Sequence, residues 1–195
     1  MIDEIVRKNR SYRRFDAEKP LGIDLLVRLI DLARLCPSSR NQQALKFMVF
    51  NKPEDNHKIF PCLSWAGYLK DWDGPPAEEQ PSGYVIILGD TTLGTKFETD
   101  LGIVAQTMML GAVEAGYGGC MISSINRAVL REVLKIQEHL EILLVLALGV
   151  PLEEVSIVPV KEGDIRYWRV NQVHYVPKRS LNEILIDSNQ LIYKD

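Results

Sequence analysis

The sequence has few residues of the kinds that build metal centres or disulfide frameworks. It contains three cysteines and three histidines among 195 residues. The cysteines, Cys36, Cys62 and Cys120, are odd in number and include no C-x-x-C pair, so we expect reduced thiols in a cytosolic protein. The histidines stand far apart without ligand spacing, which gives a metal site little support.

A strongly basic face and long apolar runs are also missing. The net charge of −3 at pH 7 argues against a nucleic-acid-binding protein, because such proteins need an extended basic surface. No apolar run is long enough to span a bilayer, and the first residues contain no apolar core of a signal peptide. We therefore expect a cytoplasmic protein without nucleic-acid or membrane partners.

The composition of the sequence is typical of a globular protein, since 46% of the residues are hydrophobic and 25% are charged. We expect a single domain over residues 1–195. Hydrophobic periodicity and turn residues predict helices and strands in alternation. A short first helix should bear Ile2, Ile5 and Val6, and a second should begin at about Asp24 as its N-cap, with Leu35 facing inward. The other expected helices are 97–115, 128–134 and 181–186. The expected strands are 47–50, which should be buried, 84–88, 120–122 and 142–148.

Residues 51–83 interrupt this pattern. Residues 57–68 have helical character, but clusters of proline, glycine and aspartate follow them. A long irregular insert inside a compact domain is often a lid or a binding loop. A surface excursion without a function is an equally open alternative.

The segment 97–115 is the longest predicted helix, and it is apolar nearly all round. Such a helix is buried, either in a core or in a subunit interface, and we favour the interface. The glycines of 116–119 come after this helix and before a strand. A dinucleotide-binding fingerprint needs strand, glycines and then helix, so we expect a helix C-cap with close backbone packing instead.

Three arginines and a serine lie close together in residues 10–15. Arg10, Arg13 and Arg14 could bind a phosphate with charge-assisted hydrogen bonds, and Ser11 adds a further donor. Phe15 would then anchor the end of the segment in the core. A solvated basic patch is the alternative for this stretch taken alone.

Five segments, in the same order along the chain, give it a resemblance to a known family. Residues 10–15, RSYRRF, resemble the R-S-x-R-x-F opening of the FMN-dependent nitroreductase family, and 37–43, PSSRNQQ, resemble its P-S-x-x-N-x-Q loop. Residues 100–119 are similar to its central helix and glycine turn, and 146–151 with 178–181 to its closing segments. Two departures are Asn9, where Arg or His is common, and Ala44-Leu45 after the loop.

The resemblance implies an α+β fold with a central mixed β-sheet flanked by helices, in an obligate homodimer with C-terminal exchange and FMN at the interface. It assigns the phosphate and ribityl chain of FMN to Arg10, Ser11, Arg13, Lys178 and Arg179. It assigns Ser38, Ser39 and Asn41 to the cofactor-contacting loop, with the two serines reaching the flavin of the other subunit. It places Met121, Ile122, Ser123 and Ser124 beside the flavin ring near N5. Ser123 is thus a candidate donor to N5, and a serine that caps the following turn is the equally open alternative.

The function that the resemblance implies is that of an FMN-dependent NAD(P)H oxidoreductase. Hydride would pass through flavin N5 in ping-pong fashion to nitroaromatic, quinone or similar small acceptors, with NADH or NADPH as reductant and no side chain as catalytic group. Residues 60–83 would shape the substrate pocket, with Tyr68 and Trp72 as candidate walls. The alternatives are a reductive dehalogenase or flavin-modifying member of the same fold, a non-catalytic flavin-binding protein, and a phosphate-binding module without flavin.

Overall fold

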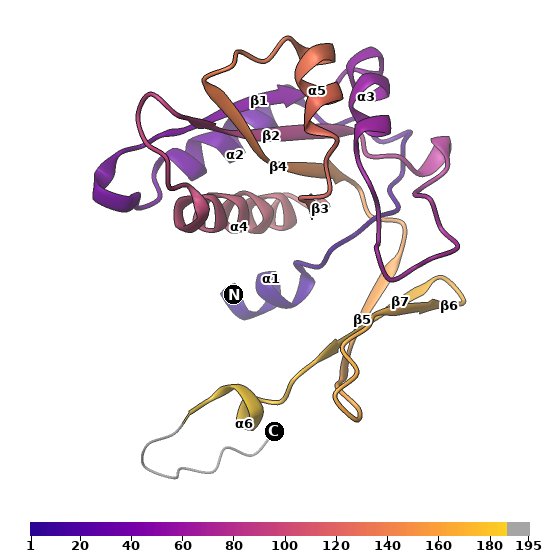
Figure 1. The fold of residues 1–195 in the computed structure, drawn as a ribbon. Helices are drawn as coiled ribbons and strands as arrows, with labels where there is room; N and C mark the ends of the chain where they lie inside the picture. The colour runs from indigo at the N-terminus through magenta and orange to yellow at the C-terminus, as the bar shows by residue number, and fades with distance from the viewer. Residues whose placement is uncertain (187–195) are drawn as a thin grey trace.

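The structure, a computed structural model, describes residues 1–186 and is built around a four-stranded sheet (Figure 1). The strand order is β1-β2-β4-β3, and all three neighbouring pairs are antiparallel. The strands are β1 (Leu45–Phe50), β2 (Gly83–Asp90), β4 (Leu140–Gly149) and β3 (Gly118–Ile122). All four expected strands therefore exist, each somewhat longer than its apolar run.

The position of each strand in the sheet explains its burial. All eight residues of β2 are buried, because this strand lies inside the sheet with a core cluster on each face. The strand β1 is only half-buried, which corrects the expectation of a buried strand at 47–50. It lies at the edge, where one neighbouring strand is missing.

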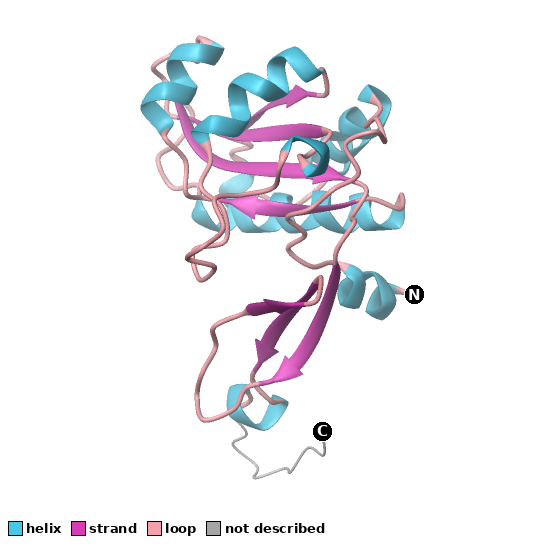
Figure 2. Cartoon of the chain, turned by 90° about the vertical axis from the view of Figure 1, so that its right-hand side faces the viewer, coloured by secondary structure: helices cyan, strands magenta, loops and turns pink. Residues whose placement is uncertain are grey.

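Helices cover both faces of this sheet (Figure 2). One core cluster joins the sheet to α2 (Ile23–Arg34) and α4 (Glu98–Glu114), and the other joins it to α3 (Pro53–Ile59) and α5 (Arg127–Leu134). The helices that the sequence predicts from about Asp24, at 97–115 and at 128–134 are therefore present. Their apolar faces are what bind the helices to the sheet.

Two helix ends differ from the expectation. Gly22, not Asp24, is the N-cap of α2, and Asp24 lies in the first turn, where its charge still opposes the helix dipole. Leu35 is 65% exposed rather than inward. In the 57–68 segment the helix α3 already starts at Pro53 and ends at Ile59. A 3₁₀ turn over Phe60–Cys62 follows it, because Pro61 has no N–H to continue the α-helical hydrogen bonds.

A second, smaller sheet follows the first and was not expected from the sequence. Its order is β5-β7-β6, with β5 and β7 parallel and β6 and β7 antiparallel. Its strands are β5 (Glu154–Pro159), β6 (Trp168–Val170) and β7 (Val173–Lys178). With α6 (Leu181–Ile184) it projects away from the main body, and α1 (Ile2–Lys8) lies between the two parts (Figure 1).

The fold is therefore α+β, as expected. The central sheet was expected to be mixed, but the parallel strand pairing lies elsewhere. The four strands of the central sheet are purely antiparallel. Parallel pairing occurs in the second sheet and in a single bridge between Ser11 and Gly119. Within residues 1–186, no helix is both long and apolar enough to cross a membrane, and no group of three potential metal-ligating side chains occurs.

Candidate functional site

The arginine-rich segment after α1 lies along the β3 edge of the central sheet. Ser11 forms the parallel bridge with Gly119, and the Tyr12 N–H donates to the Gly119 carbonyl oxygen at 2.9 Å. Phe15 is fully buried and bridges to Pro151. The prediction that Phe15 anchors this segment in the core is confirmed, and the anchor fixes where the arginines lie.

The glycine turn before β3 permits this close approach. Gly116 has φ +84° and ends α4 in a Schellman motif, with the Tyr117 N–H donating to the Ala112 carbonyl. A Cβ on Gly118 would lie 2.6 Å from the Tyr12 ring, and one on Gly119 would lie 2.5 Å from the Ala147 carbonyl oxygen. The predicted C-cap with close backbone packing is therefore confirmed.

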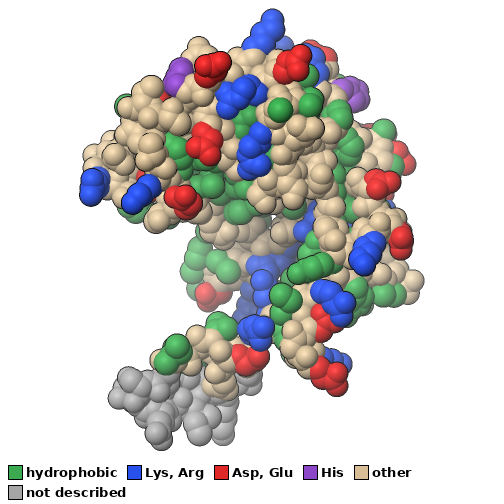
Figure 3. Space-filling model, in the orientation of Figure 1, with side chains coloured by type: hydrophobic (Ala, Val, Ile, Leu, Met, Phe, Trp, Pro, Cys, Tyr) green, Lys and Arg blue, Asp and Glu red, His purple; other side chains and the backbone are tan. Residues whose placement is uncertain are grey.

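A basic pocket of about 290 Å³ lies between this segment, β3 and the second sheet. Arg10, Ser11, Arg13 and Lys178 line it, and Figure 3 shows Lys and Arg side chains gathered in the recess between the main body and the C-terminal part. The other lining residues are Asn9, Gln106, Met109, Met121, Tyr167, His174 and Val176. Among the described residues no carboxylate lines this pocket, so it is suited to an anion.

The cations of the basic pocket retain free hydrogen-bond donors. Arg10 donates from Nη2 to the Val6 carbonyl at 2.8 Å, while its buried Nε has no partner within residues 1–186. Arg13 donates from Nη1 to the Ser11 carbonyl at 3.2 Å, and its guanidinium lies 4.9 Å above the Tyr167 ring. Lys178 has no ion-pair partner in the described part of the chain. A ligand with several acceptor oxygens could satisfy these donors.

Arg14 has a different role from the other two arginines of the segment. It forms a part-buried bidentate ion pair with Glu79, which lies in the 51–83 insert. The ion pair raises the pKa of Arg14 and lowers the pKa of Glu79. Arg14 therefore fastens the insert to the N-terminal segment and is not available to the pocket.

Glu153 links the arginine-rich segment to the second sheet. Its buried carboxylate accepts the Arg13 backbone N–H and accepts from Arg169 Nη2 at 2.8 Å. The guanidinium of Arg169 lies 4.6 Å above the Trp72 ring. Trp72 thus contacts the second sheet, and its place as a wall of the substrate pocket stays a prediction.

His174 is fully buried beside Arg13, with its Nε2 3.3 Å from Arg13 Nη1. Burial, followed by the charges of Arg13 and Arg169, lowers the pKa of His174 to about 4. The imidazole is therefore neutral at pH 7. Its Nδ1 has no hydrogen-bond partner within the described chain, and an unsatisfied buried polar group costs about 1–3 kcal/mol.

Sequence reasoning missed Glu153, Tyr167, Arg169 and His174, because it predicted no strand after residue 148. One local signal was present in Asn171-Gln172, the two residues that connect β6 to β7. Both residues have positive φ, at 49° and 71°, which is the type I′ pattern of a two-residue hairpin.

A smaller pocket of about 150 Å³ adjoins the basic pocket and shares Arg13, Met121 and Tyr167 with it. It is lined by the predicted residues Met121, Ile122, Ser123 and Ser124 together with Ser64–Gly67 of the insert and Cys120. The Ser64 N–H donates to the Ser124 carbonyl at 2.9 Å. The insert is thus fastened to the chain just after β3.

The alternative role for Ser123, a cap of the following turn, is not what the structure shows. The helix α5 is capped by Asn126, whose side chain accepts the Val129 N–H at 3.3 Å. Ser123 is exposed, and its carbonyl accepts from Arg127. Its role as a donor to flavin N5 stays a prediction.

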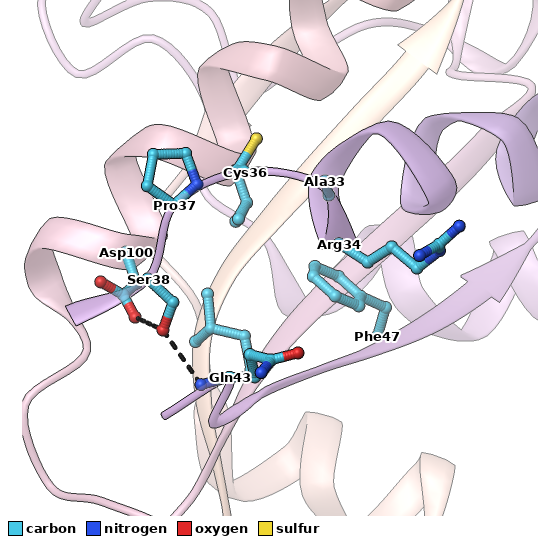
Figure 4. A pocket seen from close by; sticks show the side chains of 10 residues that line it. Ala33, Arg34, Cys36, Pro37, Ser38, Gln43, Phe47 and Asp100 are labelled. Carbon is cyan, nitrogen blue, oxygen red and sulfur yellow. Dashed lines mark hydrogen bonds between the residues drawn. The ribbon is translucent and has the colours of Figure 1, made fainter. Parts of the chain in front are cut away.

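The loop 37–43 contributes no residue to the basic pocket of its own chain. Its residues Pro37, Ser38 and Gln43 line a separate pocket (Figure 4). The Ser38 hydroxyl donates to Asp100 Oδ2 at 2.7 Å and accepts the Gln43 N–H at 3.0 Å, and the Ser39 N–H donates to Asp100 Oδ1 at 2.9 Å. Asn41 is exposed with φ 55°. The predicted contacts of this loop with a flavin stay predictions.

Arg179 also lies outside the basic pocket. It is half-exposed and ion-paired with Glu183 at 3.2 Å, one turn along α6. In this chain it does not join Arg10 and Arg13, and its predicted phosphate contact stays a prediction.

The fold and the pocket define an α+β protein with a basic pocket beside the β3 edge of its central sheet. Residues 85–150 match the model of the Nitroreductase family. The chain is 23% identical over 176 residues to "Putative NAD(P)H nitroreductase YodC" of Bacillus subtilis (strain 168), which covers 75% of this chain and 87% of that protein.

Solved structures show the same fold. The FMN-dependent nitroreductase from Clostridium difficile R20291 matches with a TM-score of 0.65 and 23% identity over 79% of this chain and 89% of that one. The nitroreductase family protein from Streptococcus pneumoniae TIGR4 matches with a TM-score of 0.69 and 17% identity over 96% of this chain and 100% of that one. The chain has the nitroreductase-like fold, and the resemblance to the nitroreductase family is confirmed.

Proposed function

We propose that this chain is an oxidoreductase, and specifically an FMN-dependent NAD(P)H oxidoreductase of nitroreductase type. The observation that carries the proposal is the meeting of Arg10, Ser11, Arg13 and Lys178 in one pocket beside residues 121–124. These segments lie far apart in the sequence. The confirmed family resemblance supports the choice of FMN among phosphate-bearing cofactors.

The residues present fit FMN chemically. A phosphate monoester carries a charge of about −1.5 to −2 at pH 7, and burying it requires paired cations. The basic pocket supplies three cations, and the unpartnered Nε of Arg10 is a donor that a phosphate oxygen could satisfy. The adjoining pocket offers a less basic continuation for the rest of the cofactor.

The residues would share the work as follows. Arg10, Arg13 and Lys178 would hold the phosphate, Ser11 would donate to the ribityl chain, and 121–124 would flank the ring. Bound FMN would supply the hydride chemistry at N5, which explains why no side chain is assigned as a catalytic group. Reductant and acceptor would occupy this site in turn, giving ping-pong kinetics with nitroaromatic, quinone or similar small acceptors.

A homodimer with exchanged C-terminal parts completes the proposal. The part formed by the second sheet and α6 projects from the main body (Figure 2). The loop residues Ser38, Ser39 and Asn41 and the cation Arg179 do not reach the basic pocket of their own chain. Within that dimer we propose that residues 1–195 form one FMN-binding domain, with 51–83 shaping the substrate pocket.

The test begins with the colour of the purified protein. The proposal expects a yellow protein whose FMN is bleached by NADH or NADPH without oxygen and regains its colour with a quinone or nitroaromatic acceptor. A colourless protein that does not take up added FMN would contradict the cofactor. FMN that binds but is not bleached by either nicotinamide would instead indicate a flavin-binding protein without this activity.

A further inference from the structure

His174 lies where three parts of the chain meet beside the basic pocket. Arg13 approaches it from the N-terminal segment, and Tyr167 lies 5.0 Å from it ring to ring. Arg169 is its register partner in β6, and Glu153 accepts hydrogen bonds from the Arg13 backbone N–H and from the Arg169 side chain. The imidazole is fully buried, so its contacts are fixed by packing rather than by solvent.

The contact with Arg13 defines the tautomer of His174. A guanidinium can only donate hydrogen bonds, so Nε2 of His174 must accept. The proton of the neutral ring then lies on Nδ1, where no partner exists among residues 1–186. The ring therefore makes the hydrogen bond to Arg13 through Nε2 and leaves its Nδ1–H without an acceptor.

We propose that His174 is a positioning residue that holds the Arg13 guanidinium at the basic pocket in the orientation needed to bind the phosphate of the cofactor. Three contacts restrain Arg13: the Nε2 acceptor of His174, the Ser11 carbonyl and the Tyr167 ring. Of these, only the imidazole changes its charge near neutral or acidic pH. The proposal rests on FMN being the ligand of this pocket.

Protonation of His174 would reverse its effect. The imidazolium would have no acceptor for Arg13 and would place a second positive charge 3.3 Å from Nη1. The other charged groups around the ring are Arg169, which opposes protonation, and Glu153, which is already bound to Arg169 and to the Arg13 backbone. Arg13 would therefore be released as the pH falls toward 4.

The experiment compares wild-type protein with His174→Phe and His174→Gln, each stripped of flavin and titrated with FMN and with riboflavin. His174→Phe removes the acceptor and keeps a ring, while the amide oxygen of His174→Gln can replace Nε2. We expect His174→Phe to weaken FMN binding about tenfold, which corresponds to about 1.4 kcal/mol, and His174→Gln to restore most of it. Riboflavin, which lacks the phosphate, should bind all three proteins equally.

The pH profile adds a readout that a purely structural role would not change. Every variant loses FMN affinity below about pH 6, where the phosphate takes up its second proton. Wild-type protein should lose more than His174→Gln between pH 6 and 4, because only the wild type also protonates its imidazole. Parallel profiles, or equal losses for FMN and riboflavin in His174→Phe, would overturn the proposal.

A measurement without flavin separates this inference from the proposed function. In the apoprotein, the signal of the Arg13 Nη1–H that donates to His174 should be resolved in a ¹⁵N NMR spectrum and slow to exchange in wild type and His174→Gln. It should be lost in His174→Phe. If no protein binds FMN, the proposed function fails while this spectrum still tests the positioning role, and an Arg13 signal that is unchanged in His174→Phe overturns that role.

Discussion

At the scale of single residues, neighbouring arginines with opposite roles provide the sharpest test of the site. Arg13 faces the basic pocket, whereas Arg14 is bound to Glu79. Charge-assisted hydrogen bonds contribute about 1.5–3 kcal/mol, so Arg13→Ala should weaken FMN binding by about one to two orders of magnitude. The dissociation constant of FMN for the apoprotein, measured by flavin fluorescence, checks this.

Arg14→Ala is the matched control for Arg13→Ala. It leaves Glu79 as an unpaired, part-buried carboxylate, so we expect lower thermal stability with FMN affinity nearly unchanged. If Arg14→Ala lost FMN while Arg13→Ala kept it, the assignment of the phosphate ligands would be wrong.

His174 also predicts how stability depends on pH. Its folded pKa of about 4 lies below the ordinary value of 6.5, so between these values the unfolded chain binds a proton that the folded chain does not. Stability should therefore be complete above pH 6.5 and fall as the pH drops toward 4, by up to about 3 kcal/mol. Urea unfolding of wild type and His174→Gln at several pH values should show this extra slope in the wild type only.

At the scale of elements, the glycines of α4 and β3 are predicted to respond in opposite directions to the same substitution. A Cβ on Gly119 would collide with the Ala147 carbonyl, which is backbone and cannot move aside. We expect Gly119→Ala to destabilise the protein by about 1–3 kcal/mol. Gly102 lies in α4 with open space around it, so Gly102→Ala should stabilise the helix by about 0.5–1 kcal/mol.

Chemical denaturation of both variants measures these two effects. Because Gly119 also pairs with Ser11 beside the basic pocket, Gly119→Ala should in addition weaken FMN binding, and Gly102→Ala should not. An unaffected Gly119→Ala protein would mean that the N-terminal segment does not approach β3 as closely as described.

The sequence predicted those helices and strands whose signal lies within a short stretch of neighbouring residues. The strand β2 is a continuous apolar run between turn residues, and α4 ends in a Gly116 whose positive φ is the signature of a helix stop. The second sheet could not be read in this way. Its strand β6 has three residues, and the burial of β5 does not alternate cleanly, so neither carries a periodic signal.

The same limit applies to the candidate site. Arg10, Ser11, Arg13 and Lys178 were identified because the resemblance supplied their roles, and the structure brings them to one pocket. Glu153 and His174 have no local motif. Their role depends on contacts with Arg13 across 140 and 161 positions of sequence, which no pattern of neighbouring residues reveals.

At the scale of the whole molecule, α4 carries apolar surface that the chain itself does not cover. Its buried side packs against α2 and the sheet, while Ile103, Leu110 and Val113 are only partly buried and lie outside both core clusters. Uncovered apolar surface of this kind favours association. The partly buried face of α4 thus supports the proposal that two copies pair and that each supplies the loop 37–43 to the other.

Two separate variants, each with one added arginine on a different helix, test this pairing. Leu110→Arg would place a cation in the proposed interface of α4, whereas Val133→Arg would place it on α5, where Val133 is already 41% exposed. Sedimentation of wild-type and Val133→Arg protein should give twice the chain mass of 22.1 kDa, and Leu110→Arg should shift toward the monomer and lose FMN with it. Because the loop residues Ser38, Ser39 and Asn41 reach no cofactor pocket of their own chain, monomer formation and flavin loss should occur together in a dilution series. A stable wild-type monomer that retains FMN would contradict both the α4 interface and the contribution of this loop across subunits.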